Sequence, residues 1–247
     1  MNIQRKRVKF FIRHLVISLF IASLALILVF IFWYPSPLSK AIGVTYLFLM
    51  MLAIDVIIGP ILGFIVYKEG KKILKADLSI IVILQILALG YGVYSIEGGR
   101  PVWVAYNVDR FELVRKNEVI TDHIEQALPQ FQDTPWFKPQ YVAVKFATDV
   151  NQRNDDMFSE VFGGISIAQK PERYVNINQA KSQLQQRAKS LKELNHYNDV
   201  QQVNYILSKH PQANAFVPLK ANAVDMTVLI NKDKGEVVKI VDLRPWK

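Results

Sequence analysis

Three long apolar runs occupy most of the first 97 residues of this 247-residue chain. The runs are Leu15–Trp33, Ala41–Tyr67 and Leu78–Ile96, and Asp55 is the charged residue among them. A helix needs about 20 apolar residues to cross the hydrocarbon core of a bilayer. A buried core helix would explain any one run, but three in succession leave no polar faces to cover such a core. The sequence therefore predicts three transmembrane helices, near residues 12–34, 42–67 and 78–96.

The basic residues lie at the edges of these runs. Of the net charge of +9, residues 1–97 carry +6 and residues 98–247 carry +3. A nucleic-acid-binding protein would instead interleave basic and aromatic side chains on one soluble face. Basic residues precede the first run and fill the loop between the second and third, and they are Arg5, Lys6, Arg7, Lys9, Arg13, Lys68, Lys71, Lys72 and Lys75.

This charge distribution predicts an orientation, because cytoplasmic loops carry the excess of lysine and arginine. The N-terminus is expected in the cytoplasm, and residues 98–247 are expected outside it, in the periplasm of a bacterium. The predicted location is thus the bacterial inner membrane, crossed three times. The chain has no cysteine, which is compatible with an oxidising compartment.

A cleaved signal peptide is an alternative for the first run, with Ser39-Lys40-Ala41 as a passable cleavage site. The apolar core of a signal peptide has about 7–15 residues. The first run is longer, and it ends in Trp33-Tyr34, a pair typical of the membrane interface.

Asp55 falls near the middle of the second predicted helix, where a charged side chain costs about 2.5–3.5 kcal/mol on insertion scales. Pro60 follows and cannot donate a backbone hydrogen bond, so a kink is expected near Asp55. Gly59 and Gly63 have the small-residue spacing that lets another helix approach closely. Three interpretations remain open: an internal pair of Asp55 with Gln85 or a hydroxyl, recognition of a partner helix, and a proton or ion path.

From Gly98 onward the composition is that of an ordinary globular domain, which divides the chain into a membrane domain (1–97) and a periplasmic domain (98–247). The pattern predicts an α+β fold with an antiparallel sheet and helices to one side. Strands are expected at 102–108, 111–115, 141–147, 215–219, 224–230 and 237–243, and helices at 121–128, 155–162, 179–194 and 198–209.

The sequence contains no recognisable catalytic pattern. The four histidines have no metal-ligand spacing, and no nucleophile or phosphate-loop motif occurs. Asp155-Asp156 is interpreted as a solvated helix start rather than as a metal site. We expect no enzyme activity, no cofactor and no nucleic-acid partner.

Several motifs together resemble the TfpX/TfpZ family of type IV pilin accessory proteins. They are Asp55-Val56-Ile57-Ile58-Gly59-Pro60, Lys71-Lys72-x-Leu74-Lys75-x-Asp77-Leu78-Ser79, Gly90-Tyr91-Gly92-x-Tyr94, Arg100-Pro101-Val102 and Val108-Asp109-Arg110-Phe111-Glu112-Leu113-Val114. A weaker match is the ending Asp242-Leu243-Arg244-Pro245-Trp246, whereas residues 116–215 match no motif of the family.

The resemblance implies a non-enzymatic inner-membrane protein of pilus biogenesis, acting as a chaperone or assembly modulator for its pilin. The implied partners are the major type IV pilin, the inner-membrane assembly platform and membrane lipid. The placement of one costly acid beside small residues and a kink leads to a hypothesis of two contacts. Asp55, Gly59, Pro60 and Gly63 would contact the pilin's transmembrane helix while the periplasmic domain contacts its globular head. Arg100, Pro101, Asp109, Arg110 and Phe111 are the candidate motif positions where the membrane helix joins the outer domain. A membrane-anchored periplasmic sensor or ligand-binding module is the alternative, and an ion transporter dependent on Asp55 is a third.

Overall fold

The computed structural model describes residues 3–147 and 149–247. The chain forms two compact units. The helical unit comprises the described residues of Met1–Phe32 together with Val44–Gly98, and the sheet unit comprises Trp33–Gly43 and the described residues of Gly99–Lys247. The short segment 33–43, which the sequence division assigns to residues 1–97, thus groups with the sheet unit.

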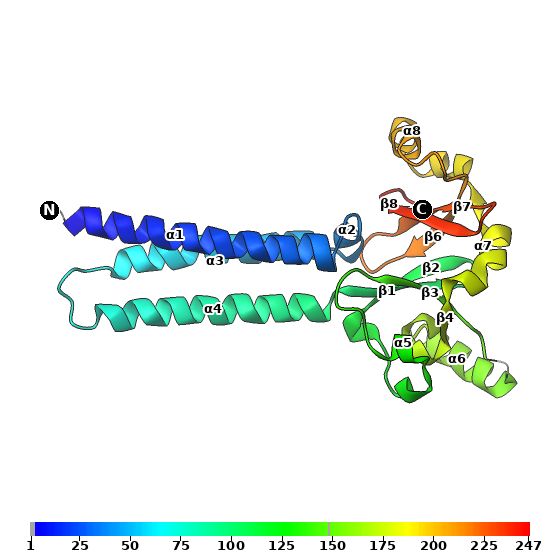
Figure 1. Cartoon of the computed structure of the whole chain (residues 1–247), viewed down its shortest axis with the longest axis horizontal. Coiled ribbons are helices and arrows are strands. Elements are labelled where there is room, and N and C mark those ends of the chain that lie inside the picture. The colour runs from blue at the N-terminus through cyan, green and yellow to red at the C-terminus, as the bar shows by residue number, and fades with distance from the viewer. Residues whose placement is uncertain (1–2, 148) are drawn as a thin grey trace. The chain divides into compact units, whose positions relative to one another are not determined.

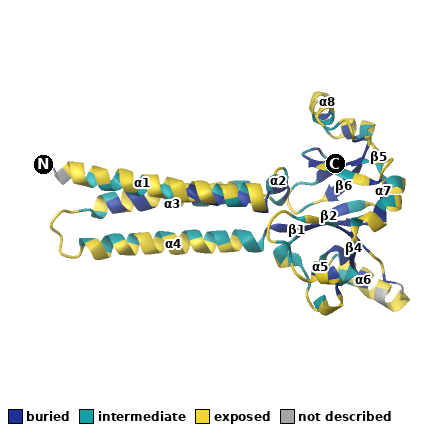
Figure 2. Ribbon diagram, viewed as in Figure 1, coloured by how far each residue is buried: buried dark blue, intermediate teal, exposed yellow. Residues whose placement is uncertain are grey.

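The helical unit contains three long helices (Figure 1). They are α1 (Ile3–Ile27), which continues as the π-helical turn η1 (Leu28–Trp33), α3 (Val44–Val66) and α4 (Leu74–Gly98). All three are long and apolar enough to cross a membrane, so the prediction of three apolar helices is confirmed and the protein is membrane-anchored. The helix α3 packs against both α1 and α4, whereas α4, described over its whole length, has no buried residue (Figure 2).

The sheet unit is built on one mixed sheet, in the order β4-β3-β1-β2-β6-β7-β8, with β5 paired to β6. The pairs β1–β3 and β2–β6 are parallel and the remaining pairs are antiparallel. The predicted α+β class is confirmed, but the sheet predicted as antiparallel contains these two parallel pairs. The strands are β1 (Pro101–Asn107), β2 (Arg110–Arg115), β3 (Gln140–Val144), β4 (Tyr174–Asn176), β5 (Lys189–Ser190), β6 (Ala215–Lys220), β7 (Met226–Asn231) and β8 (Glu236–Val241).

Buried apolar side chains lie on both faces of this sheet. Successive residues of a strand point to opposite faces, and the neighbours Phe216 and Val217 of β6 accordingly belong to different buried clusters. Leu184 of α7 packs in the cluster of Val217, and Val203 of α8 packs in that of Phe216, so helices cover both faces rather than the one side predicted. The helices of this unit are α2 (Leu38–Ile42), α5 (Pro129–Gln132), α6 (Val150–Gly163), α7 (Lys181–Arg187) and α8 (Val200–Ser208), accompanied by short 3-10 turns.

The segment that links the first two long helices is part of the core of the sheet unit. Leu38 and Ala41 of α2 pack in the same cluster as β1, β6 and β7. The carbonyl oxygen of Ala41 accepts hydrogen bonds from the backbone nitrogens of Ala223 at 2.9 Å and Val224 at 3.1 Å. Trp33 and Tyr34, expected at the membrane interface, are only 8% and 1% exposed within the protein.

Two predicted helices differ from the structure. The helix expected over 179–194 ends at Arg187, because Ala188 is extended and β5 then pairs with β6. Ser190 next caps the 3-10 turn η7 (Leu191–His196) and forms a capping box with Glu193. In the region 121–128 the structure has only the 3-10 turn η3 (Ile124–Gln126), and Pro129 begins α5 instead of ending a helix, since proline suits the first helical position.

Candidate functional site

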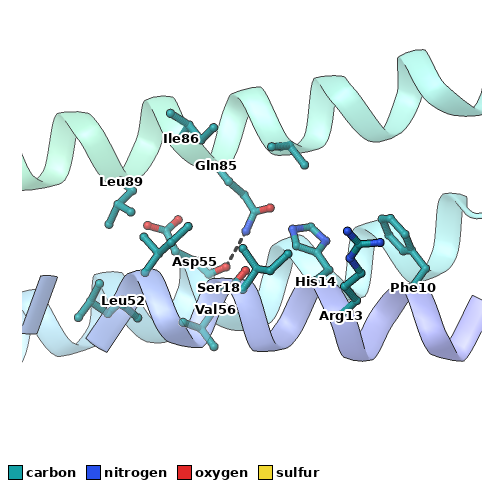
Figure 3. Close-up of a pocket in the computed structure, with 14 residues that line it drawn as sticks. Phe10, Arg13, His14, Ser18, Leu52, Asp55, Val56, Gln85, Ile86 and Leu89 are labelled. Atoms are coloured by element: carbon teal, nitrogen blue, oxygen red, sulfur yellow. Dashed lines mark hydrogen bonds between the residues drawn. The ribbon is translucent and has the colours of Figure 1, made fainter. Parts of the chain in front are cut away.

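A cavity of about 400 Å³ lies among the three long helices (Figure 3). Its walls come from one stripe of α1, a short part of α3 and one face of α4. On α1 the lining residues recur at helical spacing over several turns, from Phe10 to Ala22. The lining residues are Phe10, Arg13, His14, Ile17, Ser18, Ile21, Ala22, Leu52, Asp55, Val56, Val82, Gln85, Ile86 and Leu89.

The polar groups of this cavity are only partly satisfied. The side-chain nitrogen Nε2 of Gln85 donates a hydrogen bond of 2.9 Å to the backbone carbonyl oxygen of Asp55 (Figure 3). Within the described part of the chain, Oδ2 of Asp55, Oε1 of Gln85 and Nδ1 of His14 are buried without a hydrogen-bond partner. Because buried polar groups are nearly always paired, these three atoms mark a site that another group can complete.

Gly59 and Gly63 serve contacts inside the helical unit. A Cβ atom on Gly59 would overlap the side-chain amide of Gln85, and one on Gly63 would lie 2.9 Å from the ring of Phe10. The two glycines therefore let α4 and α1 approach α3. Pro60 is buried, and α3 runs on from Val44 to Val66 past it. Of the four intramembrane candidates, Asp55 is the one that lines the cavity.

The candidate residues that follow α4 do not form one site. Arg100 and Pro101 lie at the start of β1, whereas Asp109 and Arg110 lie at or just after the turn between β1 and β2. The whole extended length of β1 separates these two groups. Phe111 is fully buried and packs against the Tyr106 ring, with 5.2 Å between the ring centroids.

Arg100 and Arg110 each hold neighbouring segments in place. Nη1 of Arg100, a residue only 1% exposed, donates a 2.5 Å hydrogen bond to the carbonyl oxygen of Pro135. Nη2 of Arg110 lies 3.1 Å from the carboxylate of Glu112 and 3.6 Å from that of Glu160 on α6.

The helix α6 is attached to the sheet unit by its polar face, a feature that the sequence analysis missed. Asp156 is 8% exposed, and its carboxylate lies 2.7 Å from Nζ of Lys170 and 2.8 Å from Nη2 of Arg173. The expectation of a solvated Asp155-Asp156 pair is therefore wrong for Asp156. Among the described residues no cluster of metal-binding side chains occurs.

The opposite face of α6 is apolar and exposed. Residues spaced three and four apart on a helix share a face, and here this face points away from the unit it belongs to. The rings of Phe158 and Phe162 stack with their centroids 5.8 Å apart. The exposed apolar residues of the helix, called the α6 face below, are Val150, Met157, Phe158, Val161 and Phe162, with exposures from 55% to 80%.

A second, smaller cavity of about 200 Å³ lies in the sheet unit and has mostly polar walls. Glu118, one of its lining residues, accepts hydrogen bonds from Nη2 of Arg115 at 2.8 Å and from Nδ2 of Asn222 at 2.9 Å. Burial alone raises the pKa of the Glu118 carboxyl, but the hydrogen bonds and charge of Arg115, with the Asn222 hydrogen bond, outweigh burial and lower it. A small-molecule site is usually larger and mostly apolar, so this cavity gives little support to a ligand-binding module.

Comparison with known proteins places this architecture in a family. Residues 3–43 match the family described as Fimbrial assembly protein FimB. The chain is 32% identical over 230 residues to the fimbrial assembly protein of serogroup E1 from Dichelobacter nodosus, covering 89% of each chain. It is 34% identical over 180 residues to the serogroup I protein of the same organism, covering 72% of this chain and 70% of the relative.

No solved structure gives a significant match to this chain. The match to the serogroup E1 protein extends over both the apolar helices and the sheet unit, and it agrees with the resemblance to type IV pilin accessory proteins. The chain belongs to the FimB family of fimbrial assembly proteins.

Proposed function

We propose that this protein is a non-enzymatic accessory protein of type IV pilus biogenesis that binds the major pilin in the bacterial inner membrane. Its relatives are named fimbrial assembly proteins, which supports a role in making fimbriae. The observation that carries the proposal is the cavity among the membrane helices, with the buried and unpartnered Oδ2 of Asp55 in its wall.

The proposed topology has the N-terminus in the cytoplasm and the sheet unit in the periplasm. Segment 33–43 packs into the same unit as residues 99–247, so both must lie on one side of the membrane. Three crossings satisfy this requirement, because they place the first loop and the C-terminal part on the same side. The basic N-terminus and the lysine-rich loop between α3 and α4 assign the opposite side to the cytoplasm.

The occupant proposed for the cavity is the transmembrane helix of the pilin. In a bilayer, an unpaired carboxyl group raises the free energy of the empty site. A donor on an incoming helix would remove that cost, and the apolar walls would pack against its side chains. The face of α4 that lines the cavity presents Val82, Gln85, Ile86 and Leu89, which have the spacing of a single helix face. Binding would thus combine shape complementarity to the apolar walls with one polar contact to the carboxyl group of Asp55.

A second contact is proposed between the α6 face and the globular head of the pilin. Exposed apolar patches on soluble domains mark sites of interaction. The ion pairs of Asp156 with Lys170 and Arg173 hold α6 with this face outward. Two separate contacts, one in the membrane and one outside, would explain how a chaperone or assembly modulator holds a pilin before its incorporation.

The cavity is tested by filling it. Ile86 lines the cavity, whereas its neighbour Leu87 does not and is 63% exposed. We expect Ile86→Trp and Asp55→Asn each to reduce co-purification of the major pilin and surface piliation several-fold. The matched variant Leu87→Trp should leave both unchanged. Normal pilin recovery with Ile86→Trp and Asp55→Asn, at normal protein levels, would refute the cavity as the pilin site.

The α6 face is tested separately. The double variant Phe158→Ser/Phe162→Ser should lower pilin recovery while the thermal midpoint stays the same, because both side chains are already exposed. Tyr205→Ser, at a similarly exposed aromatic on α8, is the control. Equal pilin recovery with both proteins would show that α6 plays no part in capture.

A further inference from the structure

The chain connects the sheet unit to the membrane helices at three junctions. The sheet unit continues into α1 and η1 at Trp33, into α3 after Gly43 and into α4 before Gly99. Because consecutive residues are covalently linked, the residues beside these junctions lie close to the ends of the membrane helices.

The junctions converge on the same end of the strands. The carbonyl oxygen of Arg100 accepts a 2.9 Å hydrogen bond from the backbone nitrogen of Lys116, just past the end of β2. Glu118, two residues further on, binds Asn222 in the loop between β6 and β7. The next residue in that loop, Ala223, donates its backbone N–H to the carbonyl oxygen of Ala41 in α2. We call this end of the strands the attachment end.

The loop before β3 lies at the attachment end as well. The strands β1 and β3 are parallel, with Trp103 opposite Gln140, so their first residues lie at the same end of the sheet. Nη1 of Arg100 also donates to the carbonyl oxygens of Pro135 at 2.5 Å and Phe137 at 3.5 Å. This buried arginine, which follows α4 closely in the chain, thus holds the loop by its backbone.

This loop exposes two large aromatic side chains, with Trp136 at 78% and Phe137 at 58%. A fully covered aromatic side chain buries on the order of 150–250 Å², and more than half of each of these two residues is still uncovered. Pro135 and Pro139 flank them and restrict the backbone. Lys138 is exposed beside them. Trp33 and Tyr34, which the sequence suggested as interfacial anchors, are buried in protein and do not fill that role.

We propose that Trp136 and Phe137 insert into the headgroup layer of the membrane leaflet next to the sheet unit. The occupant is lipid for two reasons. The loop is held at the attachment end, where the chain continues into the membrane helices, and tryptophan is enriched at membrane interfaces. The anchor would restrict how far the sheet unit tilts from the bilayer.

The absence of cysteine from the sequence allows a direct test on the full-length protein. Single variants Trp136→Cys and Phe137→Cys are spin-labelled in phosphatidylethanolamine/phosphatidylglycerol nanodiscs, and collisions with oxygen and with a water-soluble nickel chelate are measured. Leu87→Cys on α4 is the lipid-exposed reference, and Lys234→Cys, in the turn between β7 and β8, is the water-exposed reference.

Insertion into the headgroup layer predicts an oxygen-to-nickel collision ratio at 136 and 137 between the two references, several-fold above that at 234 and below that at 87, which lies in the middle of α4. A ratio equal to that at 234 would overturn the proposal, and so would shielding from both reagents, which indicates a protein contact.

A second measurement needs no label: brominated lipids should quench a smaller fraction of the tryptophan fluorescence in Trp136→Phe than in the unsubstituted protein. Equal quenched fractions would also overturn it.

Discussion

The side-chain amide of Gln85 donates to the backbone carbonyl oxygen of Asp55, 2.9 Å away, and not to the Asp55 carboxylate. The internal pair that the sequence allowed is therefore made, but it satisfies the backbone of Asp55 and leaves Oδ2 without a partner among the described residues. This arrangement separates two roles. Gln85 and Gly59 hold α4 against α3, whereas the carboxyl group of Asp55 remains available in the cavity wall.

The first prediction concerns the contact between Gly59 and Gln85. A Cβ at position 59 would overlap the amide of Gln85, so Gly59→Ala must displace that side chain. We expect a loss of about 1–3 kcal/mol, typical of overpacking, measured as a lower thermal midpoint in detergent. Gly90→Ala is the control, because no neighbouring side chain lies within 4 Å of the position its Cβ would take. Gln85→Ala should restore much of the loss in the double variant, and additive losses would contradict this contact.

The second prediction concerns the cost of Asp55. Replacing it with leucine removes a group that costs about 2.5–3.5 kcal/mol at mid-bilayer. Asp55→Leu should therefore raise the thermal midpoint of the purified protein, or leave it unchanged, while piliation falls. This trade-off is expected where a binding site keeps an unfavourable group for a partner. A large drop in thermal midpoint would instead assign Asp55 a structural role.

The third prediction concerns the attachment of α6. Asp156→Ala leaves Lys170 and Arg173 without their buried carboxylate, and breaking such a pair costs about 3–5 kcal/mol. We expect α6 to detach locally, seen as faster proteolysis within residues 149–165. Asp155→Ala, at the exposed neighbouring position, is the matched control. Equal cleavage rates of the two variants would show that the ion pairs do not hold the helix.

The fourth prediction concerns pH. The pKa of the Glu118 carboxyl lies below its ordinary value of 4.5, because the interactions with Arg115 and Asn222 outweigh the opposing effect of burial. A lowered folded-state pKa stabilises the protein fully above the unfolded-state pKa, and this contribution disappears as the pH falls through the folded-state value. The thermal midpoint of Glu118→Gln should thus lie below that of the unsubstituted protein at pH 7, and the gap should close below about pH 4.5.

The control for this titration is Glu125→Gln, at an exposed carboxyl group 3.9 Å from Nδ1 of His123. Its thermal midpoint should follow that of the unsubstituted protein at every pH. A gap for Glu118→Gln that stays constant down to acidic pH would contradict the role of the charged carboxylate.

Features that depend on local composition could be predicted from the amino-acid sequence. Three apolar runs of membrane-spanning length predict three helices wherever they pack, because an apolar helix needs no tertiary partner to satisfy its backbone in lipid. The hairpin turn between Asn231 and Glu236 was also predicted from its glycine. Gly235 has a φ of +62°, a conformation that glycine adopts without strain. Asp55 was identified as a candidate because an acid in such a run is costly.

Features that depend on contacts between distant residues could not be predicted from local sequence patterns. Leu38 and Ala41 look like any short loop, yet they lie in the core with strands from the far end of the sequence. The helix expected over 179–194 is broken because pairing of β5 with β6 outweighs the helical pattern. The apolar face of α6 points outward because Lys170 and Arg173 hold Asp156, and no local pattern in the helix records the position of those partners.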